Sequence, residues 1–249
     1  NCNFTNSGSN PGEQEGCLKI GGIDGCEIYN ININDVEGQG IKFAHVGHHR
    51  NTKIHDCTMR LSESHSIWGE FMAMELWNLS YGNEVYNIDL NTWLSYVNFV
   101  NIYPDTPGVD NLYVHDVKCI DLNGESSKEA IEVAAPSIRV ANCYFQDKGF
   151  GFAVWNEGKR NIFIHNNIVA NVVRTPGFGF ANSAGVFVPD GSPGIKIYNN
   201  IFDRMGNAIE ISGSSGADVR NNVFLFTEGA DVQGSVATST NNLKYHTHS

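Results

Sequence analysis

The stretch NIFIHNNIVANV, residues 161–172, decides the fold of this chain. It places two adjacent asparagines, Asn166 and Asn167, within a run of isoleucine, valine and phenylalanine. Asparagine is a poor strand residue, and burying it without a hydrogen-bond partner costs free energy. The two asparagines therefore need a structural reason.

That reason is a repeat, because the same short pattern recurs along the chain. An apolar residue precedes Asn or Asp by two positions in EIYNINI (27–33), KIHDCTM (53–59), EVYNIDL (84–90), YVHDVKC (113–119), RVANCYF (139–145), FIHNNIV (163–169), KIYNNIF (196–202), DVRNNVF (218–224) and, more weakly, TSTNNLK (238–244). The aligned polar residues are Asn30, Asp56, Asn87, Asp116, Asn142, Asn166, Asn199, Asn221 and Asn241. Their spacing of about twenty to about thirty-three residues is typical of solenoids.

Each repeat also carries a second short strand upstream of the first, and both alternate with period two. The upstream strands are 18–20, 41–43, 74–76, 131–133, 152–154, 186–188 and 209–211. Short strands stacked in parallel, with loops of variable length between them, predict an all-β fold: a single-stranded right-handed parallel β-helix. We expect the aligned asparagines to lie at a bend between sheets and to form an internal Asn ladder, each amide bonding its copies on neighbouring rungs.

Composition supports one domain over residues 1–249, because 41% hydrophobic and 17% charged residues suit a long continuous core. The segment NCNF (1–4) superposes on later rungs, so we expect a fragment or processed form that lacks upstream rungs. No run of eighteen apolar residues exists, which predicts no membrane span. The net charge of −11 argues against a nucleic-acid partner.

Function in a solenoid is expected where outward side chains of successive rungs align. In the upstream strands the outward positions of four consecutive rungs are polar, and we expect Lys42 and Glu132 to face solvent. These four residues are Lys42, Glu75, Asn101 and Glu132. The simplest alternative is that Lys42 and Glu75, one rung apart, only pair with each other.

Two residues further along the same face, Trp77, Tyr103 and Trp155 form an aromatic border. Aromatic rings beside carboxylates suit sugars, whose CH faces stack on rings while their hydroxyls find polar partners. The alternative is that these rings only cover the coil.

A histidine-rich loop, HVGHHR (45–50), follows Lys42 and carries His45, His48, His49 and Arg50. It has three interpretations: a zinc site, a basic patch that receives an anionic sugar or donates a proton, and a solvated loop.

A second outward column follows the downstream strands: Tyr29, His55, Tyr86, His115, Ala141, His165, Tyr198 and Arg220. Its neighbours Glu27, Lys53 and Glu84 alternate in sign, as stacked rungs prefer. We interpret this column as stabilisation of the ladder rather than as a site.

With these repeats the chain resembles the pectate-lyase-like family of right-handed parallel β-helix proteins, which includes pectate and alginate lyases, polygalacturonases, uronan epimerases and phage depolymerases. The resemblance implies action on a polysaccharide in a groove along one outward face. The catalytic signatures of polygalacturonases, alginate epimerases and pectate lyases are absent, so no catalytic set transfers to this chain.

The resemblance favours a lyase that cleaves a uronate-containing glycan by β-elimination. Such a lyase neutralises the uronate carboxylate, removes the adjacent proton and protonates the leaving oxygen. Here Lys42, His45 and Arg50 are the candidate base and acid. Glu75, Asn101 and Glu132 are candidate ligands for calcium, which prefers hard oxygen atoms. The substrate-binding candidates are His48, His49, Trp77, Asn101, Tyr103 and Trp155.

Two other functions remain open. A glycoside hydrolase would use Glu75 and Glu132 as its two carboxylates, at a separation of roughly 9–10 Å near the wide end of the inverting range. A non-catalytic glycan-binding or structural β-helix, such as a tailspike or adhesin segment, would need no carboxylate. In each case we expect a protein that is secreted, periplasmic or at the cell surface.

Overall fold

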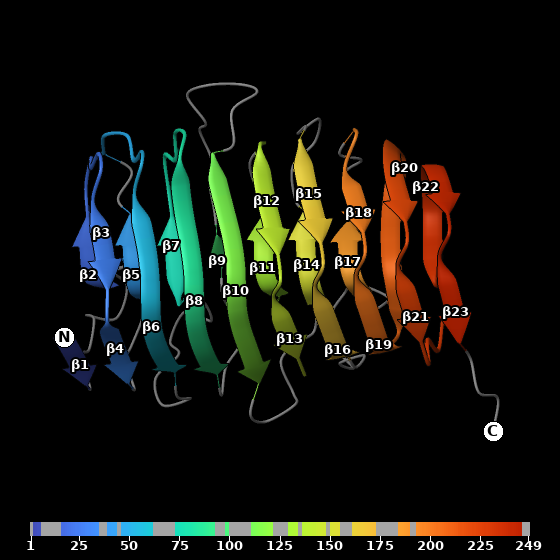
Figure 1. Ribbon diagram of the computed structural model, residues 1–249, viewed down its shortest axis with the longest axis horizontal. Helices are drawn as coiled ribbons and strands as arrows, with labels where there is room; N and C mark the ends of the chain where they lie inside the picture. The colour runs from blue at the N-terminus through green and yellow to red at the C-terminus, as the bar shows by residue number, and fades with distance from the viewer. Residues whose placement is uncertain are drawn as a thin grey trace.

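The computed structural model describes residues 2–5, 16–34, 39–43, 46–61, 73–92, 98–99, 111–121, 129–133, 136–147, 150–154, 161–172, 184–189 and 193–245. Within these ranges the chain forms parallel strands that stack along one long axis, from the N-terminal to the C-terminal end (Figure 1). In the same ranges no helix is long and apolar enough to cross a membrane. The predicted parallel β-helix is confirmed.

The strands form three rows, one above another along the axis. The first row lies at the back of Figure 1 and contains β2 (Gly16–Ile20), β5 (Gln39–Phe43), β7 (Met74–Leu76), β9 (Asn98–Phe99), β11 (Glu129–Val133), β14 (Phe150–Val154) and β17 (Ala184–Val188). The second row contains β3 (Glu27–Tyr29), β12 (Ile138–Ala141), β15 (Ile162–His165) and β18 (Lys196–Tyr198). The third row contains β1 (Cys2–Thr5), β4 (Ile31–Asn34), β13 (Tyr144–Gln146), β16 (Ile168–Val172), β19 (Ile201–Met205), β21 (Val223–Leu225) and β23 (Leu243–Tyr245).

Five strands span more than one row. The strands β6 (Lys53–Leu61), β8 (Asn83–Thr92) and β10 (Leu112–Asp121) run from the second row into the third, so the two rows form one bent surface at the front of Figure 1. The strands β20 (Asn207–Arg220) and β22 (Val232–Thr240) run from the first row into the second. All pairings between consecutive rungs are parallel, and they keep equivalent residues of the repeat side by side.

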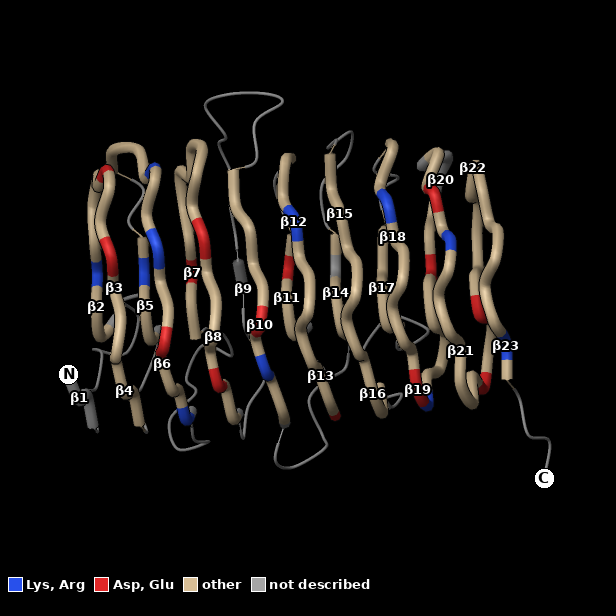
Figure 2. Tube along the Cα trace, in the orientation of Figure 1, with Lys and Arg blue, Asp and Glu red and all other residues tan. Residues whose placement is uncertain are grey.

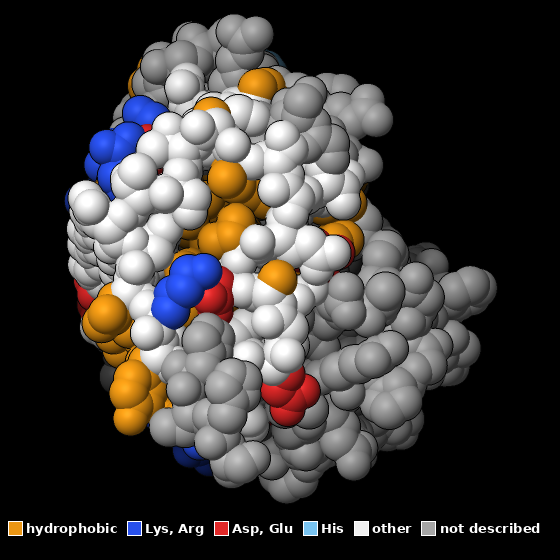
Figure 3. All heavy atoms as spheres, turned by 90° about the vertical axis from the view of Figure 1, so that its right-hand side faces the viewer, with side chains coloured by type: hydrophobic (Ala, Val, Ile, Leu, Met, Phe, Trp, Pro, Cys, Tyr) orange, Lys and Arg blue, Asp and Glu red, His pale blue; other side chains and the backbone are white. Residues whose placement is uncertain are grey.

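The core is a stack of apolar side chains that point inward from all three rows. The five largest are phenylalanines, each at most 1% exposed: Phe43, Phe145, Phe152, Phe202 and Phe224. Phe202 and Phe224 stack with ring centroids 5.7 Å apart. Where the chain turns into the first row the space is tighter, and a Cβ atom on Gly185 would lie 2.5 Å from Phe202 Cδ1. Viewed from the C-terminal end, apolar side chains are visible at the centre of the solenoid (Figure 3).

The bend between the second and third rows is formed by the aligned Asn and Asp column. All nine residues of the column have a left-handed backbone, from Asn87 at φ 52° to Asn166 at φ 58°. Asparagine and aspartate adopt this conformation at lower cost than other side-chain-bearing residues. The column is exposed, however, and it is not the buried ladder that the sequence predicts at these positions.

The ladder lies one residue later and is present in the last four rungs. Asn167, Asn200 and Asn222 each donate from Nδ2 to the Oδ1 atom of the next asparagine, over 3.0, 3.0 and 3.2 Å, and the series ends at Asn242. Each Nδ2 group also donates to a backbone carbonyl, such as that of Ile164 for Asn200. In the earlier rungs this buried position is apolar and holds Ile31, Cys57, Ile88, Val117 and Cys143. The predicted ladder thus exists, but its column was wrong by one residue.

The second-row outward column forms the predicted stack. Tyr29, His55, Tyr86 and His115 lie nearly parallel, with successive ring centroids 5.3, 4.7 and 5.0 Å apart. Beside them, Lys53 pairs with Glu84 at 3.6 Å, and Figure 2 shows the alternation of charge from β3 through β6 to β8. These contacts continue from rung to rung and stabilise the stacking of the coils.

His165 continues this column and gives the fold a pH dependence. Burial, and secondly the charge of Arg139, lowers the pKa of His165 below its ordinary value of 6.5. The unfolded chain therefore binds this proton more readily than the folded chain. The stability that depends on neutral His165 is complete above pH 6.5 and is lost as the pH falls through the lowered pKa.

We expect His165→Gln to reduce the loss of melting temperature between about pH 7.5 and about pH 5, because glutamine does not titrate. The measurement is thermal unfolding by circular dichroism at the two pH values, with His48→Gln as the control at an exposed histidine. If His165→Gln loses as much melting temperature between the two pH values as the parent protein does, this assignment is wrong.

Candidate functional site

The predicted first-row column begins with an ion pair that is closed to solvent. Lys42 and Glu75 are adjacent in the register of β5 and β7, and Lys42 Nζ lies 2.6 Å from Glu75 Oε2. Their side chains are only 4% and 3% exposed. The expectation that Lys42 faces solvent is therefore wrong. Since its ammonium group is bound by a buried carboxylate, the pair stabilises the stacking of these two rungs rather than presenting a ready base.

Glu132 lies further along the same column and is half-buried. Its register partner in β9 is Asn98, and Val133 pairs with Phe99. The expectation that Asn101 occupies this rung position is therefore wrong, and Asn101 itself lies outside the described residues. β9 lies between β7 and β11, so Glu75 and Glu132 are two rungs apart, as predicted.

The histidine-rich loop is divided between the core and the surface. His49 is fully buried and stacks on Phe43 with ring centroids 4.5 Å apart. His48 is exposed, and Arg50 is held by Asp24 with Nε 2.9 Å from Oδ2. His49 cannot contact a substrate from this position, so its assignment to substrate binding is wrong. His45 lies outside the described residues.

The aromatic border and the calcium site are only partly visible. Trp77 is half-buried, whereas Tyr103 and Trp155 lie outside the described residues. In the described part of the chain, no three His, Cys, Asp or Glu side chains come close enough to hold a metal ion. The calcium ligands Glu75, Asn101 and Glu132 stay a prediction, with Glu75 already bound to Lys42.

Among the cysteines whose side chains the structure describes, none forms a disulfide. These are Cys17 and Cys26, which are half-buried, and the buried Cys57, Cys119 and Cys143. Burial raises the pKa of Cys143 to about 12, so this thiol stays protonated and unreactive at neutral pH.

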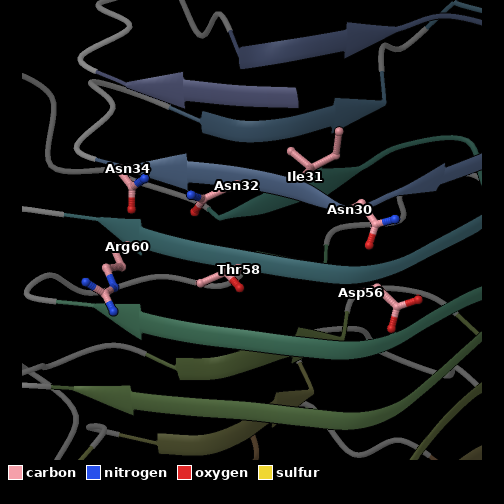
Figure 4. Close-up of a pocket in the computed structure, with 7 residues that line it drawn as sticks. All are labelled: Asn30, Ile31, Asn32, Asn34, Asp56, Thr58 and Arg60. Atoms are coloured by element: carbon pink, nitrogen blue, oxygen red, sulfur yellow. The ribbon is translucent and has the colours of Figure 1, made fainter. Parts of the chain in front are cut away.

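A groove on the opposite, front surface was not predicted from the sequence. It has a volume of about 520 Å³ and extends over the outward face of β4 and β6, at the N-terminal end of the solenoid. Its lining residues are Asn30, Ile31, Asn32, Asn34, Asp56, Thr58 and Arg60 (Figure 4). Six of these seven are polar, and together they offer amides, a hydroxyl, a carboxylate and a guanidinium.

The alternation of the two strands produces this lining. In β4 the inward residues are Ile31 and Ile33, so Asn32 and Asn34 point outward. In β6 the inward residues are Cys57 and Met59, so Thr58 and Arg60 point outward beside them, in register. A comparison of the polar residues on the third-row strands would have found the groove, but the site prediction followed the aligned charges of the first row instead.

Asp56 is the acidic group of the groove. It accepts hydrogen bonds from His55 Nδ1, at 2.7 Å, and from Asn87 Nδ2. These two hydrogen bonds, first that of His55, lower the pKa of Asp56 below its ordinary value of 3.8. The carboxylate is therefore ionised at neutral pH and holds the imidazole of the preceding residue, His55, beside the groove.

Comparison with known proteins places these features in a structural family. The model of the family described as right handed beta helix region matches residues 81–245, about two thirds of the chain. No curated protein matches the chain. Among solved structures the chain is similar to a mutant tailspike protein of Escherichia coli bacteriophage HK620 in complex with a pentasaccharide, with a TM-score of 0.47 and 12% sequence identity. The similarity covers 94% of this chain and 58% of the tailspike chain.

Proposed function

Since the chain belongs to the family of right-handed β-helix regions, we propose that it binds a uronate-containing polysaccharide on its front surface and cleaves it by β-elimination. The observation that carries this proposal is the groove over β4 and β6, whose lining consists almost entirely of polar side chains. Sugars are recognised by such groups, because each hydroxyl needs a hydrogen-bond donor or acceptor when it leaves water.

The charge distribution around the groove favours an anionic sugar. Arg60 lies at one end of the outward face of β6, and Lys53 lies at the other, with Asp56 and Thr58 between them. Lys53 and Arg60 are seven residues apart, a chain length of about 23 Å that the bend at Asp56 shortens. Carboxylates several sugars apart on a polyuronate would find a cation at each end, while amides and the hydroxyl bind the positions between them.

The same lining favours elimination over hydrolysis. Hydrolysis of a glycosidic bond ordinarily needs two carboxylates on either side of the bond. Asp56 is the single carboxylate among the described residues that line the groove, and its lowered pKa makes it a poor acid. Elimination instead needs a cation, a base and a proton donor, which this surface contains.

Binding is tested by isothermal titration calorimetry with oligosaccharides of polygalacturonate and alginate and with a neutral glucan. We expect the acidic oligosaccharides to bind and Arg60→Ala to weaken that binding about 10-fold or more, as for loss of one charge-assisted hydrogen bond. Arg204→Ala is the matched control, because Arg204 is an exposed arginine of β19 that does not line the groove. Equal binding by both variants would show that the acidic oligosaccharide does not bind in the groove.

Cleavage is tested by the ultraviolet absorbance of an unsaturated uronate. A rise in absorbance with acidic polysaccharides is the expected result, whereas new reducing ends without absorbance would show hydrolysis. Binding without either signal would show a glycan-binding module. Loss of activity in EDTA, restored by added calcium, is the outcome that the predicted calcium site requires. A polysaccharide substrate supports the further proposal that the protein acts outside the cytoplasm, whether secreted, periplasmic or at the cell surface.

A further inference from the structure

A histidine and an aspartate adjacent in the sequence form a hydrogen-bonded pair at the rim of the groove. His55 Nδ1 lies 2.7 Å from Asp56 Oδ2, and Asp56 lines the groove. Because this carboxylate is ionised, it accepts the Nδ1 proton and fixes the tautomer of the imidazole. In this tautomer Nε2 carries a lone pair and is able to accept a proton.

The ring of His55 stands between two tyrosine rings. Tyr29 and Tyr86 cover its two faces at centroid distances of 5.3 and 4.7 Å, both at an interplanar angle of 5°. The 13% of the side chain that remains exposed is therefore its outer edge. Nε2 belongs to this edge, since it is among the ring atoms furthest from Cβ. It forms no hydrogen bond with any residue that the structure describes.

From this arrangement we infer that His55 is the base and Tyr86 the acid of the elimination. This inference rests on the proposed function, because it names the groups that would perform that reaction. Tyr86 is held between His55 and His115, with ring centroids 4.7 and 5.0 Å away, so its hydroxyl has a fixed position one rung from Nε2. Lys53, two residues before His55 on the same face, supplies the positive charge for the carboxylate of the reacting sugar.

The reaction balances without any further reactant. Nε2 of His55 takes the proton from C5 of the uronate, the carbon that bears the carboxylate. The electron pair of that bond forms a double bond between C4 and C5, and the bond between C4 and the glycosidic oxygen breaks. The leaving oxygen takes the proton of the Tyr86 hydroxyl and becomes the new reducing end. Transfer of one proton from His55 to Tyr86 through solvent restores both groups.

The next ring of the stack beyond Tyr86 belongs to His115, which resembles His55 in its surroundings and serves as a comparison for the His55–Asp56 pair. His115 also stacks on Tyr86 and also binds the next residue, with Nδ1 2.7 Å from Asp116 Oδ2. Its Nε2 atom, however, lies 2.9 Å from Glu84 Oε1. The two histidines thus belong to one stack and each binds the aspartate that follows it, but they differ in whether Nε2 is already bound by a carboxylate.

The test is turnover of the acidic polysaccharide by the full chain, followed by ultraviolet absorbance. We expect His55→Gln to lower kcat by about 10²- to 10⁴-fold, as for removal of a general base. His115→Gln removes one of the two rings that hold Tyr86 but no proton-transfer group, so we expect a smaller loss. His165→Gln, in the same column but stacked on Tyr198 at 4.8 Å, is the control that is expected to change kcat less than about 3-fold. Tyr86→Phe keeps the ring and its stack and is expected to lower kcat by about 10²-fold or more. Circular dichroism melting checks the fold of each variant, and His55→Phe replaces His55→Gln if the latter does not fold.

Failures of the inference and of the proposed function are distinguishable. Normal turnover in folded His55 and Tyr86 variants would overturn the inference and leave a polyuronate lyase with other catalytic groups. An equal loss in His115→Gln would also overturn it, because the effect would then come from the stack. Absence of turnover in the parent protein, with or without binding of the oligosaccharide, would overturn the cleavage part of the proposed function and the inference with it.

Discussion

Replacement of Asn200 by alanine is expected to lower the free energy of unfolding by about 3–5 kcal/mol. The Asn200 side chain is fully buried in the ladder and makes four hydrogen bonds through its amide. Its Oδ1 atom accepts from the backbone N and from Nδ2 of Asn167, each at 3.0 Å. Its Nδ2 group donates to Ile164 O at 2.9 Å and to Asn222 Oδ1 at 3.0 Å. Truncation removes one partner from each of these buried groups, which costs about 1–3 kcal/mol for a group left unsatisfied.

Asn199, the preceding residue, supplies the control for this experiment. It is exposed at the bend, with φ 58°, and takes no part in the ladder. Asn199→Ala is expected to cost only about 1–2 kcal/mol, because alanine tolerates a left-handed backbone less well than asparagine. Both values come from urea unfolding followed by circular dichroism. A loss for Asn200→Ala no greater than that for Asn199→Ala would show that the ladder contributes little.

The misplaced ladder shows what a repeat in the sequence reveals and what it leaves open. The alternation of apolar residues was sufficient to align the rungs, and the register of His55 with Tyr86 and His115 follows that alignment. The alternation did not predict the side-chain directions at the bend. A residue with a left-handed backbone interrupts the alternation there, so the residue after it points inward. In the Asn199–Asn200 pair both residues are asparagine, so identity alone does not separate the exposed residue from the buried one.

The candidate site was less predictable for two physical reasons. An outward position in a strand does not determine exposure, because what packs over the strand is set elsewhere in the fold; Lys42 and Glu75 point outward and are nevertheless buried. The alternation is also weak around residues 93–100, so the rung was aligned on Asn101 instead of Asn98. The groove over β4 and β6 is lined by polar residues from two neighbouring strands. An alignment of the rungs reveals such a set of residues only when every outward column is compared.

Removal of the carboxylate of Glu75 is the second change expected to have a large effect. Lys42 Nζ lies 2.6 Å from Glu75 Oε2, and both side chains are almost fully buried. Glu75→Ala leaves the ammonium in the interior without its carboxylate, and such a loss costs about 3–5 kcal/mol. Asp24→Ala breaks the Arg50 pair, in which the two side chains are 46% and 53% exposed, and is expected to cost at most about 1 kcal/mol. Urea unfolding measures both.

The double variant Lys42→Met/Glu75→Leu separates a structural role of this pair from a catalytic one. A buried ion pair replaced by apolar residues of similar volume commonly retains stability, because the cost of desolvating two charges disappears with the charges. We therefore expect the double variant to unfold within about 1.5 kcal/mol of the parent protein, well above Glu75→Ala. If the pair is only structural, the double variant also keeps its turnover of acidic polysaccharide. A stable double variant without turnover would instead show that the reaction takes place on the first-row face, where Lys42 and Glu75 would act in catalysis beside Glu132.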